Sequence, residues 1–100
     1  MYNEELKTRF IRDYTGSLNT ANVATTIFNA FEKYEQEWNA DLCTKSAEEL
    51  QPAVDEVVGL RTKSKWMTLI ILKEYVKWCI AMQVPGACDG MTKIEAVGLG

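Results

Sequence analysis

The sequence of 100 residues contains no histidine. Histidine is the commonest general base near neutral pH and the commonest metal ligand, so its absence argues against acid–base or metal chemistry. An enzyme could still use carboxylates or lysine, but no spacing of the acidic residues indicates a catalytic cleft. We therefore expect a non-catalytic chain that holds no metal and no cofactor.

Cysteine is scarce, and long apolar runs are absent. The three cysteines, Cys43, Cys79 and Cys88, lack zinc-site spacing and leave one thiol over in any disulfide scheme, so we expect reduced thiols. No apolar run approaches the ~20 residues of a membrane span. The segment from Met1 to Lys7 is charged and lacks the apolar centre of a signal peptide. These features predict a cytoplasmic protein without membrane contact.

Length and composition limit the chain to one small domain. Its hydrophobic content of 47% and charged content of 25% are ordinary for a globular protein and exclude wholesale disorder. No internal repeat or low-complexity tract occurs. After Ala87 the sequence becomes glycine-rich and weakly patterned. We therefore expect residues 1–88 to form the folded domain and residues 89–100 to be a linker or a truncated boundary.

Apolar spacing predicts three helices before residue 60. The first covers Glu4–Tyr14, and the second runs from about Thr20, capped by Asn19 or Thr20, to about Trp38. The third opens with Ser46–Glu49, which fits a capping box, and ends at Gly59. The expected core positions are Leu6, Phe10, Ile11, Tyr14, Val23, Ile27, Phe31, Tyr34, Trp38, Leu42, Leu50, Val54, Val57 and Val58.

A fourth helix, over residues 61–82, has the strongest pattern and the only cluster of basic residues. Its wide apolar sector, which includes Ile80 and Met82, predicts packing on several sides. The segment from Arg61 to Gln83 has a net charge of +4 in a chain whose total is −3, which leaves −7 for the remainder. Such segregation lets one helix meet a polyanion, although lysines also solubilise exposed helices. The expected exposed ridge contains Lys63, Trp66, Ile70, Lys73, Glu74, Lys77 and Ala81.

The order of these features resembles the N-terminal core-binding domain of phage integrases and other tyrosine recombinases. The residues that carry the resemblance are Leu6–Phe10, Asn19–Thr20 with Phe31 and Tyr34, Asp41–Leu42, Ser46–Leu50, Thr62–Trp78 and Pro85–Ala87. The sequence departs from the family in lacking an aromatic residue soon after Thr20 and in a second helix poor in basic residues. The resemblance covers residues 4–88 and implies an all-α fold, a small four-helix orthogonal bundle called SAM-like.

The resemblance also implies a function. In tyrosine recombinases this domain and a catalytic domain clamp opposite faces of duplex DNA at the core recombination site. The catalytic arginine, histidine and tyrosine belong to the other domain, so this chain should bind DNA and cut nothing. Its expected partners are double-stranded DNA, the catalytic domain and neighbouring recombinase protomers, and its expected role is DNA integration or site-specific recombination.

Physical chemistry places the DNA contact at the starts of the second and fourth helices. Helix N-termini offer unpaired N–H groups and positive partial charge to phosphates, and hydroxyl and basic side chains add donors. Trp66 would supply an apolar contact to a sugar or a base edge. The predicted DNA-binding residues are Thr20, Arg61, Thr62, Lys63, Ser64, Lys65, Trp66, Lys73 and Lys77. Binding should be weak and sensitive to salt.

Two other classes of function stay open. A small helical protein–protein interaction module could use Trp66, Ile70 and the acidic second and third helices to dock a partner. A small enzyme could use the acidic pairs Glu48/Glu49 or Asp55/Glu56, but these pairs fit a solvated helix face better. An exposed apolar patch would favour the first alternative, and a concave pocket with perturbed acids would favour the second.

Overall fold

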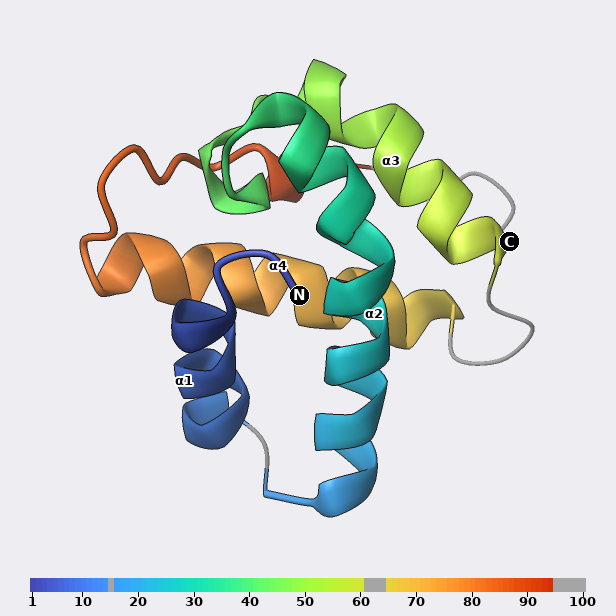
Figure 1. Ribbon diagram of the computed structural model, residues 1–100, viewed down its shortest axis with the longest axis vertical. Coiled ribbons are helices and arrows are strands. Elements are labelled where there is room, and N and C mark those ends of the chain that lie inside the picture. The colour runs from blue at the N-terminus through green and yellow to red at the C-terminus, as the bar shows by residue number, and fades with distance from the viewer. Residues whose placement is uncertain (15, 61–64, 95–100) are drawn as a thin grey trace.

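In the residues that it describes, the computed structural model of the protein contains four α-helices and two short 3-10 helices (Figure 1). The structure describes residues 1–14, 16–60 and 65–94, and no strand occurs in these residues. The elements are α1 (Glu4–Tyr14), α2 (Leu18–Trp38), η1 (Leu42–Thr44), α3 (Ala47–Gly59), α4 (Lys65–Ala81) and η2 (Met91–Lys93). The predicted all-α bundle of four helices is confirmed. Within the same residues, no helix is both long and apolar enough to cross a bilayer.

Helix α2 is at the centre of the arrangement, since it packs against α1, α3 and α4. Figure 1 shows α1 and α2 antiparallel, with α4 crossing behind α2 and α3 covering the other end of α2. Three aromatic side chains join the first, second and fourth helices. The ring of Tyr75 lies edge-on 5.2 Å from Phe10 and 4.9 Å from Phe28. All three rings are buried, so the long helices share one core.

The predicted ends of α2 and α3 are largely correct, with one exception. Helix α2 begins at Leu18 because the hydroxyl of Ser17 accepts a hydrogen bond from the backbone N–H of Thr20, so the predicted cap at Asn19 or Thr20 is wrong. At α3 the predicted capping box is present. The backbone N–H of Glu49 donates to Ser46 Oγ, and Ser46 N–H donates to Glu49 Oε1, both at 3.3 Å.

The last turn of α4 differs from the expected pattern. Ile71, Leu72 and Tyr75 are buried as predicted. Ile80 and Met82, however, are exposed, so their predicted place in the core is wrong. Helical periodicity indicates which residues share a face, but it does not show where the neighbouring helices stop covering that face.

Residues 89–94, which the sequence suggests to be linker, pack against the core. Met91 and Ile94 are buried, and η2 contacts both α3 and α4. The backbone N–H of Cys88 donates to the carbonyl of Cys43 at 2.9 Å, which holds this segment against η1. A Cβ atom at Gly90 would lie 2.3 Å from the carbonyl oxygen of Lys45, so only glycine fits there. A single 3-10 turn is too short to produce a detectable apolar period.

Candidate nucleic-acid interface

Four of the predicted DNA-binding residues lie along α4 in the described part of the chain. Lys65 is the first residue of α4, the Trp66 side chain is 66% exposed, Lys73 is half-buried and Lys77 is exposed. The spacing of residues 66, 73 and 77 places their side chains on one face of the helix. The predicted residues Arg61, Thr62, Lys63 and Ser64 lie outside the described residues.

The lysines of α4 have few competing partners. The Nζ atom of Lys77 lies 3.6 Å from Glu74 Oε1, with both side chains largely exposed. An exposed pair of this kind is weak, so the ammonium group can still reach a phosphate. Lys65 and Lys73 form no ion pair with another described residue. Helix α4 therefore offers two cations, Lys73 and Lys77, on the face that carries Trp66, and a third, Lys65, at its first residue.

Thr20 occupies a different place from the one predicted. It is half-buried in the first turn of α2 and does not cap the helix. Its backbone N–H donates to Ser17 Oγ at 3.2 Å, and the Ser17 hydroxyl donates to Thr20 Oγ1 at 2.9 Å. That N–H group is therefore already satisfied. Figure 1 shows the first turn of α2 at one end of the molecule, away from the first turn of α4, so the two predicted helix starts do not form one site.

Sequence reasoning missed a buried ionic cluster of Lys7, Glu35 and Asp41. The ammonium group of Lys7 donates to Glu35 Oε2 at 2.6 Å, to Asp41 Oδ2 at 2.8 Å and to the carbonyl of Tyr2 at 2.8 Å. Asp41 also accepts hydrogen bonds from the Tyr75 hydroxyl and from the backbone N–H of Cys43. The cluster joins α1, the end of α2, η1 and α4.

The pKa values of the two acids of the cluster are shifted in opposite directions. Burial raises the pKa of Glu35 to about 7, and the charge of Lys7 opposes this only in part. Burial acts on Asp41 in the same sense, but the charge of Lys7 and the hydrogen bond from Cys43 N–H hold the Asp41 pKa below its usual value. Glu35 Oε1 has no hydrogen-bond partner among the described residues. Glu35 is therefore the less satisfied acid.

A periodicity signal for this cluster exists in the sequence. On a helical projection at 100° per residue, Lys7 falls between Phe10 and Ile11, inside the apolar arc of α1. Glu35 likewise falls inside the arc of α2 that contains Phe31 and Phe28. Two opposite charges placed on two buried faces indicate an internal ion pair. Because the structure encloses both side chains, the cluster stabilises the fold and cannot meet DNA.

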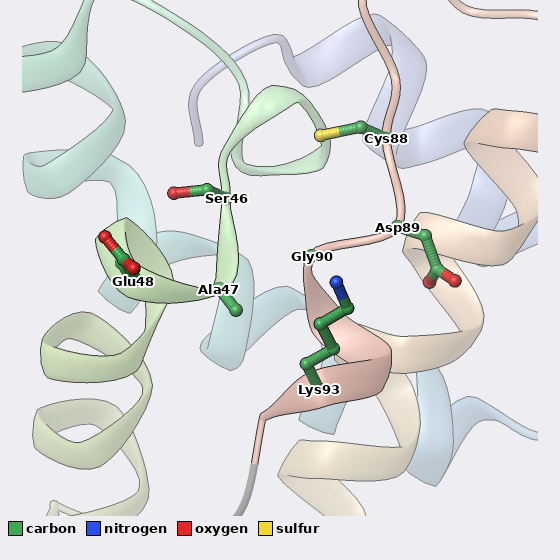
Figure 2. Close-up of a pocket in the computed structure, with 7 residues that line it drawn as sticks. All are labelled: Ser46, Ala47, Glu48, Cys88, Asp89, Gly90 and Lys93. Carbon is green, nitrogen blue, oxygen red and sulfur yellow. The ribbon is translucent and has the colours of Figure 1, made fainter.

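A surface pocket of about 640 Å³ lies between the start of α3 and the segment around η2 (Figure 2). None of the predicted DNA-binding residues lines it. Its lining includes the acidic residues Glu48 and Asp89 as well as Lys93, which disfavours a polyanion, and the capping box already uses the N–H of Glu49. All three cysteines are free thiols, and the described ranges contain no group of three or more Cys, Asp or Glu side chains placed to hold a metal.

The all-α bundle is the fold expected for a recombinase-type core-binding domain. The family model described as the MrpR N-terminal core-binding domain matches residues 1–81, so the chain belongs to this family. The expectation of a core-binding domain is thereby confirmed. No curated protein and no solved structure matches the chain.

Proposed function

We propose that this chain is the DNA-binding domain of a phage-type integrase or a related tyrosine recombinase. It would clamp duplex DNA at the core recombination site and leave strand cleavage to a separate catalytic domain. Membership of the core-binding family carries the proposal. The proposed partners are double-stranded DNA in the cytoplasm, the catalytic domain and neighbouring protomers. No catalytic role is proposed for any residue of this chain.

Electrostatics on α4 supports this proposal. Lys77 is exposed and Lys65 and Lys73 are half-buried on α4, whereas most exposed carboxylates lie on α3 and the second half of α2. The molecule is therefore polarised although its net charge is −3. Each phosphate contact releases condensed counterions, so the logarithm of the affinity should fall with the logarithm of the salt concentration by about 0.9 per contact.

The proposal predicts how removing lysines changes the salt dependence. We would measure fluorescence anisotropy of a labelled random-sequence duplex at several salt concentrations with the 100-residue chain. The triple variant Lys65→Ala/Lys73→Ala/Lys77→Ala should bind more weakly and reduce the salt slope by about 2 to 3. Lys93→Ala, which removes an exposed lysine at the end of η2, is the matched control and should change neither quantity. Absence of wild-type binding at the lowest salt, or an unchanged slope in the triple variant, would refute the proposal.

A protein–protein interaction module is the second candidate. Leu60 is 68% exposed and Trp66 is 66% exposed, and these two large apolar side chains lie at the end of α3 and the start of α4. Exposed aromatic residues are common at the centres of protein interfaces. Self-association that appears in sedimentation experiments with the wild-type chain and disappears in Leu60→Ser/Trp66→Ser would favour this candidate.

A further inference from the structure

The three cysteines of the chain gather around the short helix η1. Cys43 lies in η1 and Cys79 near the end of α4, and both residues are 0% exposed. Cys88 lies on the segment that follows α4, where its backbone N–H donates to the carbonyl of Cys43 at 2.9 Å. The chain contains no other cysteine. The fold therefore brings all of its thiol-bearing residues to one region.

Cys43 and Cys79 contact each other through their side chains. The hydrogen bond between the two thiols lowers the pKa of Cys79 and raises that of Cys43, so Cys43 is the donor and Cys79 the acceptor. A buried cysteine often acts only as a small apolar side chain, and one alone would imply nothing. Two sulfur atoms that already share a hydrogen bond need only a small approach to reach the roughly 2.05 Å of a disulfide bond.

Hydrogen bonds beside the two thiols already hold η1 against α4. The carboxylate of Asp41 accepts a hydrogen bond from the backbone N–H of Cys43 at 3.0 Å and another from the Tyr75 hydroxyl at 2.9 Å. Tyr75 lies one helical turn before Cys79, so the two residues share a face of α4. A covalent bond between Cys43 and Cys79 would therefore join two elements whose relative position is already fixed.

The thiol of Cys88 is in a different environment. It is exposed, lines the surface pocket beside the start of α3, and donates to the carbonyl of Lys45 at 3.6 Å. Its contact with Cys43 is made by the backbone. Cys43 and Cys79 are therefore the pair that is placed for a disulfide, and Cys88 offers an internal comparison.

We propose that Cys43 and Cys79 are a redox-sensitive pair, which hydrogen peroxide converts to a reversible disulfide bond. Cys43 lies in a 3-10 helix of 3 residues, and short elements open locally more readily than long packed helices. Peroxide is little larger than water, so a brief opening of η1 admits it to the pair. In a reducing compartment a disulfide of this kind is transient and responds to oxidants. The inference does not depend on the proposed DNA-binding function.

The reaction consumes one peroxide molecule and two thiols. The Cys79 thiolate attacks one oxygen of peroxide, the O–O bond breaks, and the leaving hydroxide becomes water with the proton that the thiol released. The product is a sulfenic acid on Cys79, which condenses with a neighbouring thiol. The sulfur of Cys43 attacks the sulfur of Cys79, the S–O bond breaks, and the hydroxide leaves as water with the proton of Cys43. Each sulfur gives up one electron, and the peroxide is reduced to two water molecules.

The experiment uses the Cys88→Ser variant of the 100-residue chain, in which Cys43 and Cys79 are the remaining thiols. The native variant is treated with peroxide, unfolded in urea and labelled with N-ethylmaleimide. Intact mass spectrometry should show a monomer that has lost two hydrogen atoms and carries no label, and dithiothreitol should restore both labelling sites. Because the bond closes the loop between residues 43 and 79, the unfolding equilibrium constant should fall by a factor on the order of 10² to 10³, which raises the urea midpoint.

Cys79→Ala, which retains Cys43 and Cys88, is the matched control and should form no disulfide within the chain. If it does form one, the reactive pair is Cys43 with Cys88 and the inference is overturned. Cys88→Ser that keeps both thiols, or that gains further oxygen atoms in place of the disulfide, also overturns it. So does an oxidised Cys88→Ser that is less stable than its reduced form, since the two sulfur atoms would then be badly placed for the bond. The measurements on Cys88→Ser stand whether or not Cys79→Ala folds.

Discussion

Two lysine–glutamate pairs of nearly equal length lie in opposite environments. Lys7 Nζ is 2.6 Å from Glu35 Oε2, and both side chains are 0% exposed. Lys33 Nζ is 2.5 Å from Glu56 Oε1, with side chains 62% and 46% exposed. The first pair joins α1 to α2 inside the core, and the second joins α2 to α3 at the surface. On the N–O distance alone, the two ion pairs would be expected to contribute equally to stability.

The two ion pairs differ in their contribution to stability because one is buried and the other is exposed to water. Water screens the exposed pair and solvates each partner when the pair breaks, so exposed pairs contribute about 0 to 1 kcal/mol. A buried charge that loses its partner stays desolvated, which costs about 3 to 5 kcal/mol. The same argument separates the lysines by role. Lys7 is committed to the fold, whereas Lys65, Lys73 and Lys77 can exchange water for phosphate.

The largest effect is expected from Lys7→Met. This variant leaves Glu35 and Asp41 buried together without a counter-charge, so the free energy of unfolding should fall by about 3 to 5 kcal/mol. Urea denaturation followed by circular dichroism measures the change.

A second variant keeps this prediction testable. Lys7→Met/Glu35→Leu removes one of the two uncompensated charges, and Asp41 keeps the hydroxyl of Tyr75 and the N–H of Cys43. The double variant should regain at least about half of the loss, because apolar replacement of a buried ion pair is often near neutral. A loss in Lys7→Met below about 1 kcal/mol would contradict the argument, since that is the range of exposed pairs.

The buried pair should also make stability depend on pH. The pKa of Glu35 is raised from 4.5 to about 7, so its favourable contribution is complete below pH 4.5 and is lost as the pH rises through about 7. The corresponding change in the free energy of unfolding is about 3 kcal/mol. The lowered pKa of Asp41 acts the other way, but only at pH values below its ordinary 3.8. Urea midpoints should therefore fall between pH 5 and pH 8.

The variant Glu35→Gln tests whether Glu35 causes this slope. It removes the titrating group, so the free energy of unfolding should become nearly flat between pH 5 and pH 8. Glu37→Gln changes an exposed acid two residues further along α2 and should keep the wild-type slope. A slope that survives Glu35→Gln would assign the titration to another group.

Much of the fold could be predicted from the sequence, and the features that could not be predicted were missed for physical reasons. The helices were predictable because α1, α2 and α3 each carry a clear apolar face, and Ser46 with Glu49 marks a helix start by local chemistry alone. The burial of Lys7 was not predictable from its own helix, because a lysine is counted as polar whichever face of the helix it occupies. Recognising it requires the position of Glu35 on another helix. Met91 escaped detection because a single turn has no period.

The candidate site was harder to predict than the fold. The lysines of α4 are recognisable because the segment from Arg61 to Gln83 has a net charge of +4 in a chain whose total is −3. Thr20 is a predicted helix cap, but the structure assigns that role to Ser17, three residues earlier.

The smallest effect is expected from Lys33→Met, the surface counterpart of Lys7→Met. Both partners are already hydrated, and the hydroxyl of Tyr34 still donates to Glu56 after the change. The free energy of unfolding should therefore change by less than about 1 kcal/mol, and added salt should reduce the difference further. Urea denaturation at low and high salt measures both quantities. If Lys33→Met lowered the free energy of unfolding as much as Lys7→Met does, the N–O distance rather than solvent exposure would determine the strength of an ion pair. That result would contradict the comparison of the two pairs.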